Sequence, residues 1–184
     1  MAESRLQPRR FGGTGIALVE QPLRTAIDVR GDPRDTRFLR ALQSVTDLPP
    51  PLEPGTSASG LLATLLWLGP DEWLVMSDAQ AGEGLGASLA AALRGMPCAV
   101  TDVSDARIVY AVSGSNAREL LARGCPLDLH DRSFPPGRCA QSVLARIPAI
   151  VHRAGAEPAF EIHVARSYCD YAWAWLLAAA ADYA

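Results

Sequence analysis

The stretch that most constrains the fold is residues 65–76, which read LLWLGPDEWLVM. Two apolar runs rich in Leu, Val and Trp flank Gly69-Pro70-Asp71-Glu72, and residues of these types favour chain reversal. The segment therefore predicts a buried β-hairpin, which needs neighbouring strands to cover both faces. We interpret Asp71 and Glu72 as solvated turn residues rather than as a catalytic pair, because a turn carboxylate can accept backbone N–H groups.

Composition narrows the possible classes of protein. The chain has 184 residues, of which 49% are apolar, so it is globular and can bury one sizeable core or two small half-domains. Its net charge of −3 provides no basic surplus for binding nucleic acid. The sequence contains no Lys, which excludes Schiff-base and Walker-type lysine chemistry.

The N-terminal segment and the cysteines indicate a soluble, cytoplasmic protein. Residues 1–15 are polar, lack the apolar core of a signal peptide and predict a flexible arm. The longest apolar candidate for a membrane span, residues 172–181, is about half of the ~20 residues required. No C-x-x-C pair is present, so we expect neither a zinc site nor disulfides but free, mostly buried thiols. These are Cys98, Cys125, Cys139 and Cys169.

The pattern of strands and helices predicts an α+β fold. Strand-like runs lie between Ile16 and Val29, and Asp32-Pro33 is suited to begin a helix that carries Phe38 and Leu42. The Pro-rich residues 47–60 predict a loop. The order β-α-(long loop)-β-β-α is expected twice, over residues 23–94 and 107–181. We therefore expect residues 16–184 to form a single unit of two similar βαββα-type halves, about 16–96 and 97–184, with mostly antiparallel sheets.

A glycine motif superficially matches a dinucleotide-binding fingerprint. Gly82, Gly84 and Ala87, with Asp102 about twenty residues later, fit the form G-x-G-x-x-A. However, five residues separate the hairpin from the first glycine, Glu83 would lie beside the pyrophosphate, and no second parallel βαβ unit follows. We interpret the glycines as the start of a helix.

The three histidines do not predict a catalytic or metal site. His130 lies near Asp128, Asp131 and Cys125, but closeness in sequence does not make a Cys/His pair. His152 and His163 fall in adjacent predicted strands and could face each other, yet two histidines without a third ligand make a poor metal site. We expect cross-strand packing or partner contact there.

Two aspartates after the glycine motif are also interpreted structurally. Asp105 is expected to be a turn residue, and Asp102 is expected to pair with a nearby Arg.

The last helix, which we expect to begin at Ser167, is apolar on most of its circumference. Tyr168, Tyr171 and Trp175 share one face, and Trp173 lies nearly opposite. Such a helix has more apolar surface than a small core covers, so one face should meet another chain. We hypothesise that Tyr171, Trp173 and Trp175 form a partner interface, with Trp173 or Trp175 as the anchor. The alternative is that both Trp residues pack inside the monomer.

Separated motifs carry a resemblance to a known family. They are LWLGPDEWLV in the hairpin, DVS at residues 102–104, VSG at 112–114, ARELL at 117–121, GCPLDL at 124–129, FPPG at 134–137 and the segment 167–175. Together they resemble the gamma subunit of heterotetrameric sarcosine oxidase, a relative of the folate-binding glycine-cleavage T-protein fold. The resemblance covers roughly residues 20–180.

The resemblance implies a non-catalytic structural or assembly subunit. The complex would oxidatively demethylate sarcosine, or a related N-methyl amino acid, to glycine and transfer the one-carbon unit to tetrahydrofolate. FAD, FMN, NAD, zinc and tetrahydrofolate would belong to the other subunits, and the partners would be the alpha, beta and delta subunits. We assign no catalytic, cofactor-binding or metal-binding residue to this chain. The alternatives are a stand-alone folate-binding aminomethyltransferase-like protein and a small regulatory or chaperone-like folate binder.

Overall fold

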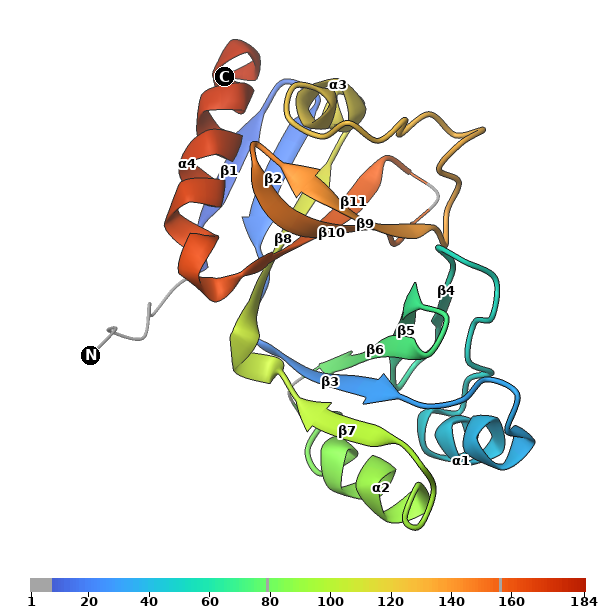
Figure 1. Ribbon diagram of the computed structural model, residues 1–184. Coiled ribbons are helices and arrows are strands. Elements are labelled where there is room, and N and C mark those ends of the chain that lie inside the picture. Colours follow the sequence, from blue (N-terminus) through green and yellow to red (C-terminus); the bar gives the residue numbers. More distant parts are fainter. Residues whose placement is uncertain (1–7, 79, 156) are drawn as a thin grey trace. The chain divides into compact units, whose positions relative to one another are not determined.

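The computed structural model describes residues 8–78, 80–155 and 157–184, and its chain divides into two compact units (Figure 1). The first unit comprises the N-terminal segment to Pro22, Arg107–Pro136 and Gln141–Ala184. The second comprises Leu23–Ala106 and Gly137–Ala140. The sequence predicts a division near residue 96, whereas these units take segments from both sides of that point.

The first unit is built on a six-stranded sheet. In spatial order its strands are β1 (Arg10–Gly13), β2 (Ile16–Glu20), β8 (Arg107–Ser113), β11 (Ala159–Ala165), β10 (Ile147–Arg153) and β9 (Cys139–Leu144). The β1–β2, β2–β8, β8–β11 and β10–β11 pairs are antiparallel. β1 is a correction to the flexible arm expected over residues 1–15, because Arg10–Gly13 pair with β2; residues 1–7 of that arm lie outside the described residues.

Two helices belong to this unit. They are α3 (Ala117–Ala122) and α4 (Cys169–Ala180), and α4 is flanked by 3-10 turns at Arg166–Tyr168 and Ala181–Tyr183. Alternate residues of the strands, including Leu18, Tyr110 and Ile162, are buried, as the two-residue period of a strand requires. On α4 the buried residues are Ala172, Trp173, Leu176, Ala179 and Ala180.

The second unit is built on a five-stranded sheet that contains the predicted hairpin. Its strands, in spatial order, are β4 (Ser57–Ser59), β5 (Thr64–Gly69), β6 (Glu72–Asp78), β3 (Arg24–Arg30) and β7 (Ala99–Asp102), and the β4–β5, β5–β6, β3–β6 and β3–β7 pairs are antiparallel. A 3-10 turn, Ser104–Ala106, follows β7. The hairpin prediction is confirmed. The loop expected over residues 47–60 holds the short strand β4, which its Pro, Gly and Ser content did not indicate.

The helices α1 (Thr36–Thr46) and α2 (Leu85–Ala92) share one core with this sheet, and Figure 1 shows both on the same side of it. Phe38 and Leu42 of α1 and Leu89 of α2 are buried in that core together with Trp73. The N-cap of α1 is Asp35, whose carboxylate accepts a hydrogen bond from Arg37 N–H at 2.9 Å. The expected cap, Asp32, instead accepts hydrogen bonds from Arg34.

Each unit contains the order β-α-β-β-β-α, and the two sheets share the strand order that results from it. β3, α1, β4, β5, β6 and α2 correspond to β8, α3, β9, β10, β11 and α4, and the sheets read β4-β5-β6-β3 and β9-β10-β11-β8. The predicted α+β fold with two similar, mostly antiparallel halves is confirmed. Within the described part of the chain, no helix is both long and apolar enough to cross a membrane.

Candidate functional site

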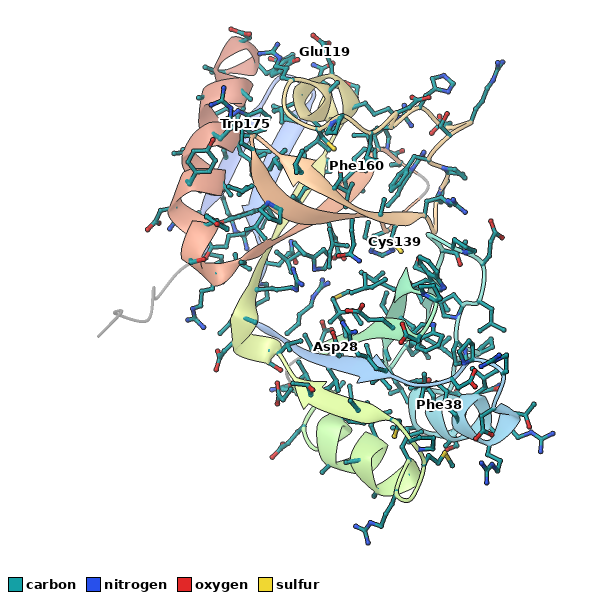
Figure 2. All side chains as sticks on the ribbon, in the orientation of Figure 1. Asp28, Phe38, Glu119, Cys139, Phe160 and Trp175 are labelled. Carbon is teal, nitrogen blue, oxygen red and sulfur yellow. The ribbon has the colours of Figure 1, made fainter. Side chains whose placement is uncertain are left out.

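A surface groove beside α4 contains two of the three residues of the interface hypothesis. It has a volume of about 520 Å³ and includes Tyr171 and Trp175. Figure 2 shows Trp175 on the side of α4 that faces α3. The other lining residues are Ala122, Arg123, Gly124, Cys125, Pro126, Val143, Ala145 and Arg146. Tyr171 is 47% exposed and Val143 is 40% exposed, so the groove presents apolar and aromatic surface beside two Arg side chains.

A glycine allows Trp175 to reach this position. A Cβ atom added to Gly124 would lie 2.4 Å from Cζ2 of Trp175, a distance that real Cβ atoms do not show. The indole ring therefore rests directly on the Gly124 backbone. Any side chain at residue 124 would displace the ring.

The floor of the groove includes a strained turn. β9 and β10 are joined by Ala145 and Arg146, whose φ angles are 46° and 76°. A two-residue hairpin loop with both φ angles positive normally uses Asn or Gly, and other residues there cost about 1–3 kcal/mol each. Ala145 N–H donates to Gly124 O at 2.9 Å, and the Tyr171 hydroxyl donates to Ala145 O at 2.6 Å. Two lining residues of the groove, Gly124 and Tyr171, therefore hold the strained turn in place through these hydrogen bonds.

Trp173, the third residue of the hypothesis, lies in the core of its unit. It is 9% exposed, and its ring centroid is 5.7 Å from that of Tyr110. The Arg9 guanidinium covers the ring at 5.9 Å. Little of Trp173 is left for a partner subunit, so the surface available for an interface comes from Tyr171 and Trp175.

The glycine motif lies where α2 meets the sheet. A Cβ atom on Gly82 would lie 2.4 Å from the Thr25 side chain, and one on Gly86 would lie 3.1 Å from Ile27. Gly84 has a φ of 76° and is the N-cap of α2. Close packing explains why residues 82 and 86 are glycine, and the positive φ angle explains why residue 84 is glycine. The preceding strand, β6, pairs antiparallel with both neighbours, which is not the parallel context of a dinucleotide fingerprint.

A second hollow, of about 670 Å³, lies in the other unit between the start of α1 and the β5–β6 turn. Its lining residues are Arg30, Gly31, Asp32, Pro33, Arg34, Pro70, Asp71, Pro97, Cys98 and Ala99. Its cations have local partners: Arg34 Nε donates to Asp32 at 3.0 Å, and Arg30 Nη2 lies 2.9 Å from a Glu72 oxygen. The Arg34 hydrogen bond lowers the pKa of Asp32, and burial raises the pKa of Glu72.

The polar loop around His130 forms local hydrogen bonds. Asp128 accepts hydrogen bonds from His130 N–H at 3.0 Å and from the Ser133 hydroxyl, which lowers its pKa, the Ser133 bond being the larger cause. The Sγ of Cys125 lies 4.0 Å from the Ser142 hydroxyl. The structure therefore places Cys125 against β9 rather than in the His130 turn.

The carboxylate of Asp102 bonds to Ser104, whereas the sequence predicts that it pairs with an Arg. Its carboxylate accepts hydrogen bonds from the Ser104 hydroxyl at 2.6 Å and from Ser104 N–H at 2.9 Å. These bonds lower the pKa of Asp102. The DVS motif therefore stabilises the turn after β7, because Ser104 Oγ also accepts a hydrogen bond from Ala26 N–H at 3.0 Å.

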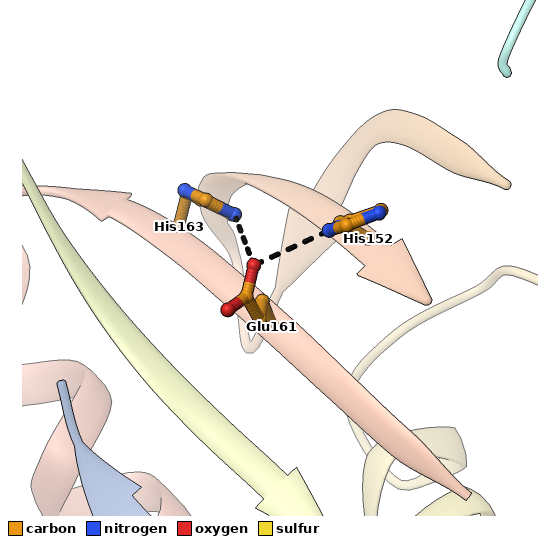
Figure 3. A group of neighbouring side chains, drawn as sticks. All are labelled: His152, Glu161 and His163. Carbon is orange, nitrogen blue, oxygen red and sulfur yellow. Dashed lines mark hydrogen bonds and ion pairs between the residues drawn. The ribbon is translucent and has the colours of Figure 1, made fainter. Parts of the chain in front are cut away.

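The structure brings His152 and His163 together with a carboxylate, Glu161, that the histidine pattern alone did not indicate. Figure 3 shows Glu161 between the two imidazoles. His152 Nδ1 lies 3.2 Å, and His163 Nε2 lies 3.8 Å, from Glu161 Oε2. The two histidines are 2% and 1% exposed, and the three ligand atoms all lie within 4.8 Å of one another. His152 is opposite Glu161 in the register of β10 and β11, and His163 follows two residues later on the same face.

The fold is shared with a known class of proteins, those with a T-protein-like fold. Its paired, antiparallel α+β halves match the glycine cleavage system aminomethyltransferase T from Bartonella henselae, with a TM-score of 0.68 and 20% identity. That match covers 90% of this chain and 46% of the aminomethyltransferase. At this identity it shows the T-protein-like fold alone.

The sequence relatives identify the family. A family model described as sarcosine oxidase, gamma subunit family matches residues 30–182. Sarcosine oxidase subunit gamma from Arthrobacter sp. is 34% identical over 185 residues, covering 100% of this chain and 88% of the relative, and the subunit from Corynebacterium sp. strain P-1 is 35% identical over 186 residues. The chain belongs to the sarcosine oxidase gamma subunit family.

A solved structure supports this assignment. It is the heterotetrameric sarcosine oxidase from Corynebacterium sp. U-96 in complex with pyrrole 2-carboxylate, matched with a TM-score of 0.86 and 30% identity over 94% of this chain and 87% of that chain.

Proposed function

We propose that this chain is a non-catalytic structural subunit of a sarcosine-oxidase-type complex. The complex oxidatively demethylates sarcosine, or a related N-methyl amino acid, to glycine and transfers the one-carbon unit to tetrahydrofolate. The main observation in support of this proposal is the structural match, over nearly the whole chain, to a chain of a heterotetrameric sarcosine oxidase. The partners in this proposal are alpha, beta and delta subunits. The cytoplasmic location that the sequence predicts belongs to the same proposal.

The proposal assigns FAD, FMN, NAD, zinc and tetrahydrofolate to the other subunits. In support, the glycines that resemble a nucleotide fingerprint are accounted for by packing against Thr25 and Ile27 and by the left-handed cap of α2. Two Arg side chains that line the 670 Å³ hollow are paired with carboxylates of this chain, Arg34 with Asp32 and Arg30 with Glu72. The carboxylate of the DVS motif, Asp102, accepts a hydrogen bond from the Ser104 hydroxyl and so stabilises the turn after β7.

We propose the groove beside α4 as the surface that meets a partner subunit. Tyr, Trp and Arg are enriched in interfaces, and this groove presents Tyr171, Trp175 and Arg146 together. A Trp seated in a pocket of a partner typically contributes 2 kcal/mol or more, which is about a 30-fold change in affinity. The pinned β9–β10 turn gives the groove a rigid floor, so little ordering is required on binding.

Substitution of the groove aromatics tests this surface. Trp175→Ala should reduce the affinity for the partner subunits about 30-fold in a binding assay, with the far-UV circular dichroism of the free chain unchanged. Tyr168→Ala is the matched control, because Tyr168 is also exposed, at 41%, but does not line the groove. If the two variants bind the partner subunits with equal affinity, the groove is not part of the interface.

The alternative function is a stand-alone folate-binding aminomethyltransferase-like protein, which the T-protein-like fold favours. Titration of tetrahydrofolate onto the purified chain, followed by tryptophan fluorescence, separates the two. The subunit proposal predicts no saturable change at concentrations that saturate a glycine-cleavage T-protein measured in parallel. Saturable binding with one site per chain would favour the alternative.

A further inference from the structure

Two imidazoles and one carboxylate meet on one face of the β10–β11 pair. The register places His152 directly opposite Glu161, and residues i and i+2 of a strand share a face, so His163 joins them from β11. The register neighbours of this trio on the same face are apolar: Ile150 is opposite His163 on β10, and Val109 and Ala111 are opposite His163 and Glu161 on β8. The trio is thus a compact polar cluster within an apolar sheet face.

The distances within the cluster suit coordination by one small cation. Zn²⁺ binds His nitrogen and carboxylate oxygen at about 2.0–2.2 Å, so two ligand atoms on adjacent corners of a tetrahedron lie about 3.3 Å apart. The observed separations from Glu161 Oε2 are 3.2 Å to His152 Nδ1 and 3.8 Å to His163 Nε2. All three ligand atoms lie within 4.8 Å of one another, so their separations are close to those of neighbouring ligands around one ion.

Charge and burial favour a divalent ion with an affinity for nitrogen. The side chain of Glu161 is 13% exposed and carries the single negative charge of the trio, while the imidazoles coordinate in their neutral form. Two His ligands disfavour Mg²⁺ and Ca²⁺, which require oxygen ligands, and favour first-row transition ions. The strand framework fixes the relative positions of all three side chains, because they lie on one hydrogen-bonded strand pair.

We propose that His152, Glu161 and His163 form a Zn²⁺-binding site, with three protein ligands and a fourth position for water or another ligand. This goes beyond the proposed subunit role and revises the expectation that the chain binds no metal. That expectation rested on two histidines without a third ligand. Glu161 supplies the third ligand, and bound Zn²⁺ would join β10 to β11.

Zn²⁺ titration of the full chain tests the site. The chain is purified without a polyhistidine tag, treated with EDTA, loaded with Zn²⁺ and desalted, and its metal content is measured by inductively coupled plasma mass spectrometry. We expect one Zn²⁺ per chain and a rise in melting temperature that depends on Zn²⁺ concentration. Co²⁺ loading should give the visible absorption bands of a low-symmetry site with nitrogen and oxygen ligands.

Three variants locate the bound ion. Glu161→Gln keeps the shape of the side chain but removes the anionic ligand, and His163→Gln removes an imidazole; each should retain less than one-tenth of the wild-type Zn²⁺. His130→Gln is the matched control, because His130 is an exposed loop residue and is not one of the three clustered ligands, and it should retain full binding. Circular dichroism of the metal-free variants reports folding, and Glu161→Gln alone decides the outcome if His163→Gln does not fold.

Two results would overturn the proposal. One is a wild-type chain that retains less than one-tenth of an equivalent of Zn²⁺ after desalting. The other is equal Zn²⁺ content in wild type, Glu161→Gln and His130→Gln, which would place the ion elsewhere. Neither result bears on whether the chain assembles with partner subunits, so the two proposals fail independently.

Discussion

Trp73→Phe should destabilise the chain substantially, because Trp73 joins the central hairpin to α1 and to the Pro-rich loop. Trp73 is 0% exposed, its ring centroid is 5.6 Å from that of Phe38, and its indole N–H donates to Pro51 O at 2.8 Å. Phenylalanine fills part of the space and keeps the contact with Phe38. It cannot donate the hydrogen bond, and it leaves a cavity where the larger ring was.

The magnitude follows from these two losses. An orphaned buried acceptor costs about 1–3 kcal/mol, and the low end applies because Pro51 is half-buried and water can reach it. Complete truncation of a buried Trp to Ala costs about 3–5 kcal/mol, and replacement by Phe, which loses less than half of the side chain, should cost about 1–2 kcal/mol. We therefore expect a total loss of about 2–3 kcal/mol.

Urea unfolding monitored by circular dichroism measures this loss. Trp67→Phe is the matched control, since Trp67 is opposite Trp73 in the hairpin but only half-buried. Its loss should be about 1 kcal/mol or less, as for other partly exposed positions. The reasoning is refuted if Trp73→Phe loses no more stability than Trp67→Phe.

Two further predictions use the titrating groups. Burial raises the pKa of Cys139 to about 11, so at pH 8 only about one Cys139 thiol in a thousand is ionised. Cys98 is half-buried, so iodoacetamide should alkylate it far faster than Cys139, as measured by peptide mapping. Equal alkylation rates for the two cysteines would contradict this prediction. The side-chain hydrogen bond from Arg37, followed by its backbone N–H, lowers the pKa of Asp35 from 3.8 to about 2, so the charge stabilises the folded state above pH 3.8 and this contribution is lost as the pH falls through 2. Asp35→Asn should therefore lower the urea midpoint at pH 5 and approach wild type near pH 2; a difference that does not depend on pH would contradict the assignment.

The local patterns predict the elements well where apolar periodicity is strong. The hairpin is where the sequence indicates, and His152 and His163 lie in adjacent strands, β10 and β11, as expected, because each of these strands has a buried face with branched or aromatic residues. The opposition on the last helix also holds: Tyr171 is exposed and Trp173 is buried. The start of α1 was misplaced, because Asp32 and Asp35 are both competent caps and only the folded backbone selects between them.

Features that depend on pairing between distant segments were missed. β1 and β4 are short edge strands of four and three residues with little apolar alternation, and they form because β2 and β5 offer free edges. The strand β2 pairs with β8, far along the chain, which sequence periodicity cannot indicate. Glu161 was not recognised as a neighbour of His152 for the same reason, although Glu161-x-His163 shows that these two share a strand face.

We propose that the chain works as one subunit of a larger, flavin-bearing assembly. The most direct test is native mass spectrometry, with an absorbance spectrum, of the material purified through an affinity tag on this chain after co-expression with its candidate partner subunits. We expect a heterotetramer that contains this chain and carries flavin absorbance, while the chain purified alone is colourless. Recovery of this chain alone under conditions where the other subunits are folded and abundant would contradict the subunit role.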